Sequence, residues 1–299
     1  MSLLVTGTLA FDSVETPFDS RTDAIGGSAT YAAYAASLFT PVRLVSVVGT
    51  DFPDETTAAL RSRGICTEGL EVADGQTFRW SGRYEKDWNT RTTLATHLNV
   101  LETFDPKVPA SYADSEYVFL GNASPEVQMK ALSQCKNARF VVCDTMNLWI
   151  DIAKDGLLEL LTKVDAVVMN DEESEMLTGE RSLVRAGEKI LQMGPKIAIL
   201  KKGEHGALVI QPSGLFQVPA YPVANVIDPT GAGDCFAGGF IGYVASSQNF
   251  QPQTLKRAML YGTATASVCV EGFSVEPFAD QSRGSIEARF NELVAQTSL

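Results

Sequence analysis

Short runs of apolar residues alternate with longer amphipathic stretches along most of this chain. The runs have the length of buried strands, and the stretches between them repeat apolar residues at the spacing of helices. The predicted strands are Leu3–Gly7, Val42–Val48, Tyr117–Gly121, Phe140–Asp144, Ala166–Asn170 and Ile197–Lys201. The predicted helices are Ser28–Phe39, Pro53–Arg63, Pro125–Cys135, Asp155–Lys163, Ser182–Met193, Asp234–Ala245, Gln253–Val270 and Ser285–Gln296. Because strands and helices alternate, we expect an α/β fold of three layers, in which a mostly parallel sheet carries helices on both faces.

The segment from about Leu70 to Phe104 breaks this alternation. It is polar and β-prone, and its aromatic and basic side chains alternate with the period of two that is typical of hairpins. Because a pair of strands is too small to fold alone, we interpret residues 1–299 as one domain with a small β lid at about 70–104. The lid is also the candidate contact of a homodimer. The alternative is a surface ribbon without a role in catalysis. A second hairpin is predicted at Ala207–Ile210 and Leu215–Val218.

The composition fits one large α/β domain and disfavours several partners. The chain has 299 residues, of which 45% are hydrophobic, enough to bury a large core. Its formal net charge of −12 leaves no basic field to recruit nucleic acid or an anionic membrane. Neither a signal peptide nor a membrane-spanning apolar run is evident, and the five cysteines lack Cys-x-x-Cys spacing. These features predict a cytoplasmic protein with reduced thiols.

A glycine-rich run near the C-terminal third carries the most specific chemistry. It reads Asp228-Pro-Thr-Gly-Ala-Gly-Asp234, and a helix is predicted to begin at its end. The small residues Gly231, Ala232 and Gly233 bring backbone N–H groups close to a ligand, and the positive end of a helix favours an anion there. A carboxylate at an anion site is useful if it accepts the proton of an attacking hydroxyl. We therefore interpret Asp234 as the base of phosphoryl transfer to an alcohol. The alternative is a turn with a helix-capping aspartate.

This run resembles the C-terminal signature of the PfkB family of carbohydrate and nucleoside kinases, which have the ribokinase-like fold. The resemblance implies ATP as the phosphoryl donor, Asp234 as the base, the amides of residues 231–233 as an anion hole, and Thr230 beside the nucleotide. Some members hold a potassium ion next to this loop, which makes Asp228 a candidate ligand here. No Gly-x-x-x-x-Gly-Lys-Ser/Thr sequence is present, so a P-loop enzyme is not indicated.

Two further motifs resemble the nucleotide side of the same family. Asn170-Asp-Glu-Glu173 follows a predicted strand and resembles the Asn-x-x-Glu element. The resemblance places Asn170 near the nucleotide and implies that Glu173 positions magnesium through water. The alternative is an acidic helix start. Lys201-Lys202-Gly203-Glu-His-Gly206 resembles the nucleotide-side loop, in which Gly203 and Gly206 admit the nucleotide and Lys202 contacts phosphate.

The acceptor side is predicted mainly from the N-terminal half. The run Gly26-Gly27-Ser-Ala-Thr-Tyr31 resembles the Gly-Gly sugar-binding element of the family, although many relatives have Asn where this chain has Tyr31. Asp12 matches the family aspartate that accepts hydrogen bonds from acceptor hydroxyls. Asn122 and Asp144, which lie at or after the ends of predicted strands, are further candidate substrate-binding residues.

Together these patterns predict an ATP- and magnesium-dependent kinase that phosphorylates a hydroxyl, in the first place a primary one, of a small sugar. Tyr31 and the aromatic residues of the lid favour an adenosine-like ribonucleoside as the alternative acceptor, because rings stack on a base. The lid aromatics are Phe78, Trp80, Tyr84 and Trp88. A non-catalytic nucleotide- or metabolite-binding protein is the alternative from another class. An NAD-dependent dehydrogenase is disfavoured, because no Gly-x-Gly-x-x-Gly follows the first strand.

Overall fold

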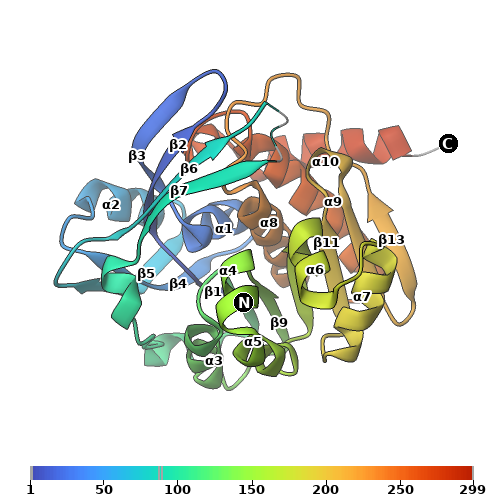
Figure 1. Cartoon of the computed structure of the whole chain (residues 1–299), viewed down its shortest axis with the longest axis horizontal. Helices are drawn as coiled ribbons and strands as arrows, with labels where there is room; N and C mark the ends of the chain where they lie inside the picture. Colours follow the sequence, from blue (N-terminus) through green and yellow to red (C-terminus); the bar gives the residue numbers. More distant parts are fainter. Residues whose placement is uncertain (1–2, 87, 89, 298–299) are drawn as a thin grey trace.

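A nine-stranded sheet forms the centre of the computed structural model, which describes residues 3–86, 88 and 90–297 (Figure 1). The strands lie in the order β13-β12-β11-β10-β9-β8-β1-β4-β5. All neighbours from β11 to β5 are parallel, and β12 and β13 add an antiparallel hairpin at one edge. The strands are β1 (Leu3–Thr6), β4 (Val42–Gly49), β5 (Ile65–Ala73), β8 (Tyr117–Leu120), β9 (Phe140–Asp144), β10 (Ala166–Asn170), β11 (Ile197–Lys201), β12 (Ala207–Gln211) and β13 (Gly214–Val218).

Helices cover both faces of this sheet, so the predicted three-layer arrangement is confirmed (Figure 1). Leu3 and Val5 of β1 enter a core with α1, α8, α9 and α10, whereas Leu4 enters a second core with α3, α5 and α7. This alternation is that of a strand buried on both sides. The helices are α1 (Ser28–Ser37), α2 (Asp54–Ser62), α3 (Pro125–Ser133), α4 (Asn147–Ile152), α5 (Lys154–Leu161), α6 (Asp171–Thr178), α7 (Leu183–Gln192), α8 (Ala232–Ser247), α9 (Pro252–Cys269) and α10 (Arg283–Thr297).

Small residues let α8 pack closely between α1 and α9. A Cβ atom built on Gly238 would lie 2.2 Å from the carbonyl oxygen of Ala32 in α1. A Cβ atom on Gly239 would lie 2.1 Å from Oγ1 of Thr265 in α9. Larger side chains at these positions would push the helices apart. The small residues after Asp234 therefore let α8 lie close against both neighbouring helices.

A second, four-stranded sheet in the order β3-β2-β6-β7 lies across the upper left of Figure 1. It consists of β2 (Ala10–Glu15), β3 (Ser20–Gly26), β6 (Phe78–Tyr84) and β7 (Arg91–His97). The prediction for residues 70–104 missed the two N-terminal strands, and residues 70–73 belong instead to β5 of the large sheet. β2 pairs in parallel with the distant β6, a contact that local patterning does not reveal. Asp87 and Asn89 lie outside the described residues.

The other predicted strands and helices are present with shifts of a few residues at their ends. Among the described residues, α4 and α6 are the two α-helices that the apolar pattern did not predict. Only Ile150 is buried in α4, and α6 begins with three acidic residues, so neither carries a continuous apolar stripe. Within the described ranges, no helix combines the length and the apolar character that crossing a membrane requires.

Candidate active site

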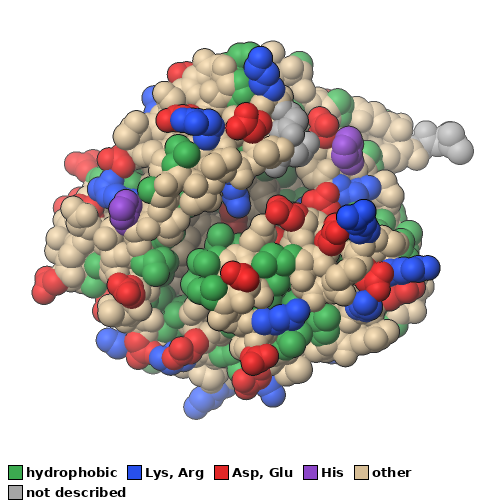
Figure 2. Space-filling view, in the orientation of Figure 1, with side chains coloured by type: hydrophobic (Ala, Val, Ile, Leu, Met, Phe, Trp, Pro, Cys, Tyr) green, Lys and Arg blue, Asp and Glu red, His purple; other side chains and the backbone are tan. Residues whose placement is uncertain are grey.

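Polar side chains from three neighbouring strands meet at the carboxyl edge of the large sheet. β9, β10 and β11 end in Asp144, Asn170 and Lys201, and Asn170 is in register with Lys201. Ligands of parallel α/β sheets bind outside this edge. Figure 2 shows a hollow between the small sheet and the elements below it, with a basic side chain inside.

The first turn of α8 presents unused backbone donors to this edge. Gly231 precedes the helix with φ 76°, a left-handed conformation that suits glycine. The N–H groups of Gly231, Gly233 and Asp234 donate to no described residue. Ala232 differs from the prediction, because its N–H donates to the carbonyl oxygen of Pro229 at 3.1 Å. The available donors are therefore those of residues 231, 233 and 234, because the turn that sets the helix start uses the amide of Ala232.

The Asp234 carboxyl is half-buried and lies close to other carboxylates. Burial raises the pKa of Asp234 to about 7, and repulsion from Asp144 and Asp12 adds to the rise. Lys201 and Arg91 lower the pKa but do not cancel the effect of burial. A pKa near neutrality suits a group that accepts a proton from an alcohol and later releases it.

Lys201 is a site residue that the sequence interpretation missed. Its side chain is only 17% exposed, and Nζ lies 3.7 Å from Oδ2 of Asp144. A Cβ atom built on Gly233 would lie 2.7 Å from Nζ, so the ammonium lies directly beside the start of α8. Burial would lower the pKa of Lys201, but Asp144, Glu173 and Asp234 outweigh it and raise the pKa. The ammonium is therefore charged.

Asn170 and Glu173 form a reciprocal cap at the start of α6. Oδ1 of Asn170 accepts the N–H of Glu173, and Oε2 of Glu173 accepts the N–H of Asn170, both at 2.7 Å. The alternative interpretation of this motif as a helix start is therefore correct as far as it goes. Oε1 of Glu173 makes no hydrogen bond to a described residue, and burial raises the pKa of Glu173 to about 7. Lys201 opposes this rise and Asp144 adds to it.

The described side chains at this edge do not form a complete set of metal ligands. The described residues contain no group of three or more His, Cys, Asp or Glu side chains arranged around one metal position. This fits magnesium, which keeps several waters and is usually held by substrate phosphates with one or two carboxylates. Glu173, with one carboxylate oxygen unused, fits the role of holding a water of such an ion.

The remaining predicted nucleotide-side residues lie in two loops. Gly206 has φ 84°, and a Cβ atom there would lie 2.1 Å from the carbonyl oxygen of Val218. Gly203 begins the single turn Gly203–His205, and the N–H of Lys202 donates to the carbonyl oxygen of Gly206 at 2.8 Å. The positive φ values of Gly203 and Gly206 therefore explain on structural grounds why glycine stands at these positions.

Asp228 and Thr230 are buried in the loop before α8. Oδ1 of Asp228 accepts the N–H of Thr230 at 2.9 Å, and burial raises the pKa of Asp228. Oγ1 of Thr230 bonds to the hydroxyl of Tyr84 in β6 at 3.4 Å. The small sheet is thus in direct contact with the loop that precedes Asp234.

Asp12 and the glycine pair meet where the small sheet joins α1. Oδ2 of Asp12 accepts the N–H of Gly27 at 3.4 Å, and a Cβ atom on Gly26 would lie 1.9 Å from the same oxygen. Burial raises the pKa of Asp12 to about 7, which the Gly27 N–H opposes and Asp228 increases. This carboxyl also lies near enough to Asp234 to raise the pKa of Asp234.

Two predicted substrate-binding side chains are occupied by the protein itself. Tyr31 is 2% exposed, and a Cβ atom on Gly231 would lie 2.3 Å from its Cγ, so the ring packs beneath the glycine loop and does not stack on an acceptor. The amide of Asn122 donates from Nδ2 to Sδ of Met146 at 3.1 Å and accepts at Oδ1 from Nε1 of Trp149 at 2.8 Å. Neither side chain is therefore free to bind an acceptor. The Tyr31 ring is packed against the glycine loop, and the Asn122 amide is hydrogen-bonded within the protein.

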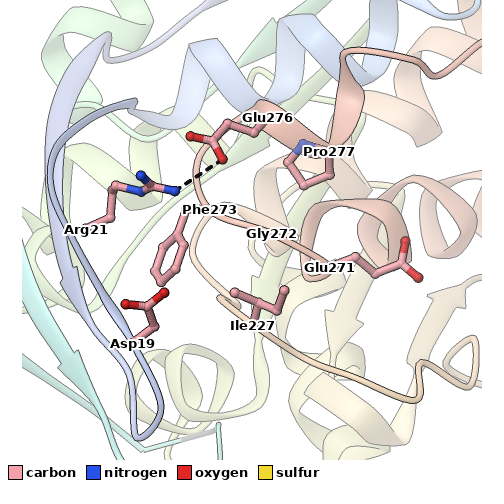
Figure 3. A pocket seen from close by; sticks show the side chains of 8 residues that line it. All are labelled: Asp19, Arg21, Ile227, Glu271, Gly272, Phe273, Glu276 and Pro277. Carbon is pink, nitrogen blue, oxygen red and sulfur yellow. Dashed lines mark hydrogen bonds and ion pairs between the residues drawn. The ribbon is translucent and has the colours of Figure 1, made fainter.

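A separate cavity of about 490 Å³ contains none of the predicted site residues. Figure 3 shows it between the end of the β2–β3 turn and the loop 271–277, with Arg21 paired to Glu276 across it. Ile227, which lines it, is the neighbour of Asp228 in sequence. Its lining lacks the strand ends that parallel sheets use for ligands, so we assign the chemistry to the edge around Asp234.

Comparisons with known proteins identify the family of this chain. Residues 6–280 match the PfkB family of carbohydrate kinases, and the chain belongs to this family. It is similar to the cytidine kinase of Thermococcus kodakarensis, with 31% identity over 247 residues that cover 81% of this chain and 87% of the relative.

Solved structures show the same fold at low sequence identity. The nucleoside kinase of Burkholderia thailandensis in complex with inosine has a TM-score of 0.81 at 20% identity and covers 98% of both chains. A candidate Ribokinase II of E. coli in complex with ATP and Mg²⁺ has a TM-score of 0.79 at 21% identity and covers 97% of this chain and 99% of its own. The expected ribokinase-like fold is therefore confirmed.

Proposed function

We propose that this protein transfers the terminal phosphoryl group of ATP to a primary hydroxyl of a small sugar or of a nucleoside. The observation that carries the proposal is the half-buried Asp234 carboxyl at the start of α8, with its raised pKa, beside the unused N–H groups of Gly231 and Gly233. Membership of the PfkB family supports the same reaction.

In the proposed reaction, the acceptor oxygen bonds to the terminal phosphorus while the bond from that phosphorus to ADP breaks. Asp234 takes the hydroxyl proton, which balances the charge on the attacking oxygen. The free amides at the start of α8 bind the migrating phosphoryl group, and they are already oriented before the reaction. Magnesium would neutralise the phosphates when bound, and Glu173 is the residue that would position one of its waters.

Asp12, Gly26 and Gly27 are the proposed acceptor-binding residues. The carboxyl of Asp12 accepts hydroxyl hydrogen bonds, and the two glycines allow close approach of a polyol. The small sheet is the proposed lid, supported by the contact of its Tyr84 with Thr230. We propose the same sheet as a homodimer contact, which light scattering of the purified protein tests.

A nucleoside is the second candidate acceptor. The similarity to a cytidine kinase over most of both chains favours it. Tyr31 no longer supports stacking on a base, so the aromatic residues of the small sheet remain the candidates for this contact. Trp80 lies half-buried in that sheet, with the guanidinium of Arg91 5.4 Å from its ring centre.

The test is a coupled assay of ADP release with ATP and Mg²⁺ against D-ribose, 2-deoxy-D-ribose, cytidine, adenosine and inosine. The proposal expects turnover with at least one acceptor that has a free primary hydroxyl, and none with its 5-deoxy or 5′-deoxy analogue. Binding without turnover across the panel would favour a sensor. Comparing potassium with tetramethylammonium salts in the same assay tests the proposed potassium ion beside Asp228.

A further inference from the structure

The ammonium group of Lys201 makes no hydrogen bond to a described residue, although its side chain is only 17% exposed. Among the described residues, Nζ forms an ion pair with Oδ2 of Asp144. Their distance of 3.7 Å is too long for a hydrogen bond from any of the three N–H groups. The described residues offer Nζ no other acceptor in range. The ammonium is therefore poised for an acceptor that the protein itself does not supply.

Two kinds of donor converge at this point. Nζ lies 2.7 Å from the position that a Cβ atom of Gly233 would occupy, and the N–H groups of Gly233 and Asp234 are also without a partner. An ammonium beside the open amides of a helix start matches a group with several charged oxygens. A side chain at position 233 would push the ammonium away from its present place, because Nζ is the movable end of a flexible side chain.

We propose that Lys201 is a further catalytic residue, whose ammonium binds the terminal phosphoryl group of ATP while it is transferred. This assignment rests on the proposed kinase function and deepens it. Asp144 holds the ammonium at one side, and the phosphoryl oxygens supply its missing hydrogen bonds. Because the ammonium keeps its charge throughout the reaction, it stabilises the negative charge on the migrating group.

A purely structural role makes a different prediction. If Lys201 only neutralised Asp144, Glu173 and Asp234, its removal would disturb every ligand of the site to a similar extent. A residue that binds the terminal phosphoryl group affects ATP but leaves ADP almost unchanged, because ADP lacks that group.

The experiment measures the affinities of Lys201→Met for ADP and for the β,γ-imido analogue of ATP by titration calorimetry of the full chain with Mg²⁺. Loss of a charged hydrogen bond should weaken the analogue about 10- to 100-fold, while ADP changes by less than about threefold. Lys196→Met is the matched control. Lys196 immediately precedes β11, its side chain is 77% exposed, and neither affinity should change.

Two results would overturn the assignment. One is unchanged affinity for both nucleotides in a folded Lys201→Met protein, and the other is an equal loss for both nucleotides. If Lys201→Met does not fold, the double variant Lys201→Met/Asp144→Asn removes the carboxylate left unpaired and is expected to give the same selective loss. If the unmodified protein binds neither nucleotide, the kinase proposal itself fails and this assignment falls with it.

Discussion

Replacing Asp234 with Asn tests both the proposed base and the electrostatics of the site. Asn keeps the shape of the side chain but takes up no proton from a hydroxyl. A positioned general base contributes about 10²- to 10⁴-fold to the rate, so kcat should fall by that factor. ATP affinity should change little, because the amides that bind phosphate are backbone groups.

The same substitution has a predicted effect on stability. The pKa of Asp234 is raised from 3.8 to about 7, so the folded protein keeps a proton that the unfolded chain releases. Ionisation of the carboxyl therefore lowers the free energy of unfolding progressively as pH rises from 3.8 to about 7. Above about pH 7 the loss of stability is complete. Since one pKa unit is about 1.4 kcal/mol, the cost grows by about 2–3 kcal/mol between about pH 5 and pH 7. Asp234→Asn removes this cost. The gain in free energy of unfolding of the variant over the unmodified protein should therefore be about 2–3 kcal/mol larger at about pH 8 than at pH 5.

The assays are steady-state kinetics and urea unfolding without ligands at both pH values. In the unmodified protein kcat/KM should rise with pH and level off near the pKa of about 7, and the variant should lose this rise. Asp155→Asn, at an exposed position in α5, is the control and should change neither quantity. Near-normal kcat in Asp234→Asn would refute its role as base, and equal stability changes at both pH values would refute the raised pKa.

Two further substitutions test neighbouring parts of the site. Glu173→Gln should raise the Mg²⁺ concentration for half-maximal activity about tenfold, because it weakens the group that orients a metal-bound water, and an unchanged titration midpoint would contradict this. Gly231→Ala places a Cβ atom 2.3 Å from Cγ of Tyr31 at φ 76°, which should cost about 2 kcal/mol or more in urea unfolding. In a double-mutant cycle, Gly231→Ala should cost less in a Tyr31→Ala background than in the unmodified protein, and an equal cost in both backgrounds would mean that backbone strain alone is responsible.

Most strands of the large sheet were predictable because each has a local apolar signal, whereas β5, which is mostly exposed or half-buried, was not predicted. Runs such as Ala166–Asn170 are apolar throughout, as expected for parallel strands with both faces covered. The small sheet was only half predicted. Ser20–Gly26 is mostly exposed or half-exposed and carries no apolar run, and β2 pairs with a strand far along the chain. Such pairing depends on tertiary contacts, so patterning found β6 and β7 and missed their partners.

The site shows the same division between local and tertiary information. The helix start at Asp234 follows from the glycine run, but the loss of the Ala232 amide depends on a turn to Pro229 that no residue type reveals. Lys201 and Lys202 are adjacent lysines, and the family resemblance drew attention to Lys202. One rule favoured Lys201: it ends its strand level with Asn170, at the carboxyl edge where parallel sheets gather ligand-binding side chains. Lys202 follows one residue later, where the chain has left the sheet and its backbone turns back to Gly206. The period-two geometry of a strand therefore directs one lysine toward Asp144 and the start of α8, and the same geometry excludes its neighbour from that position.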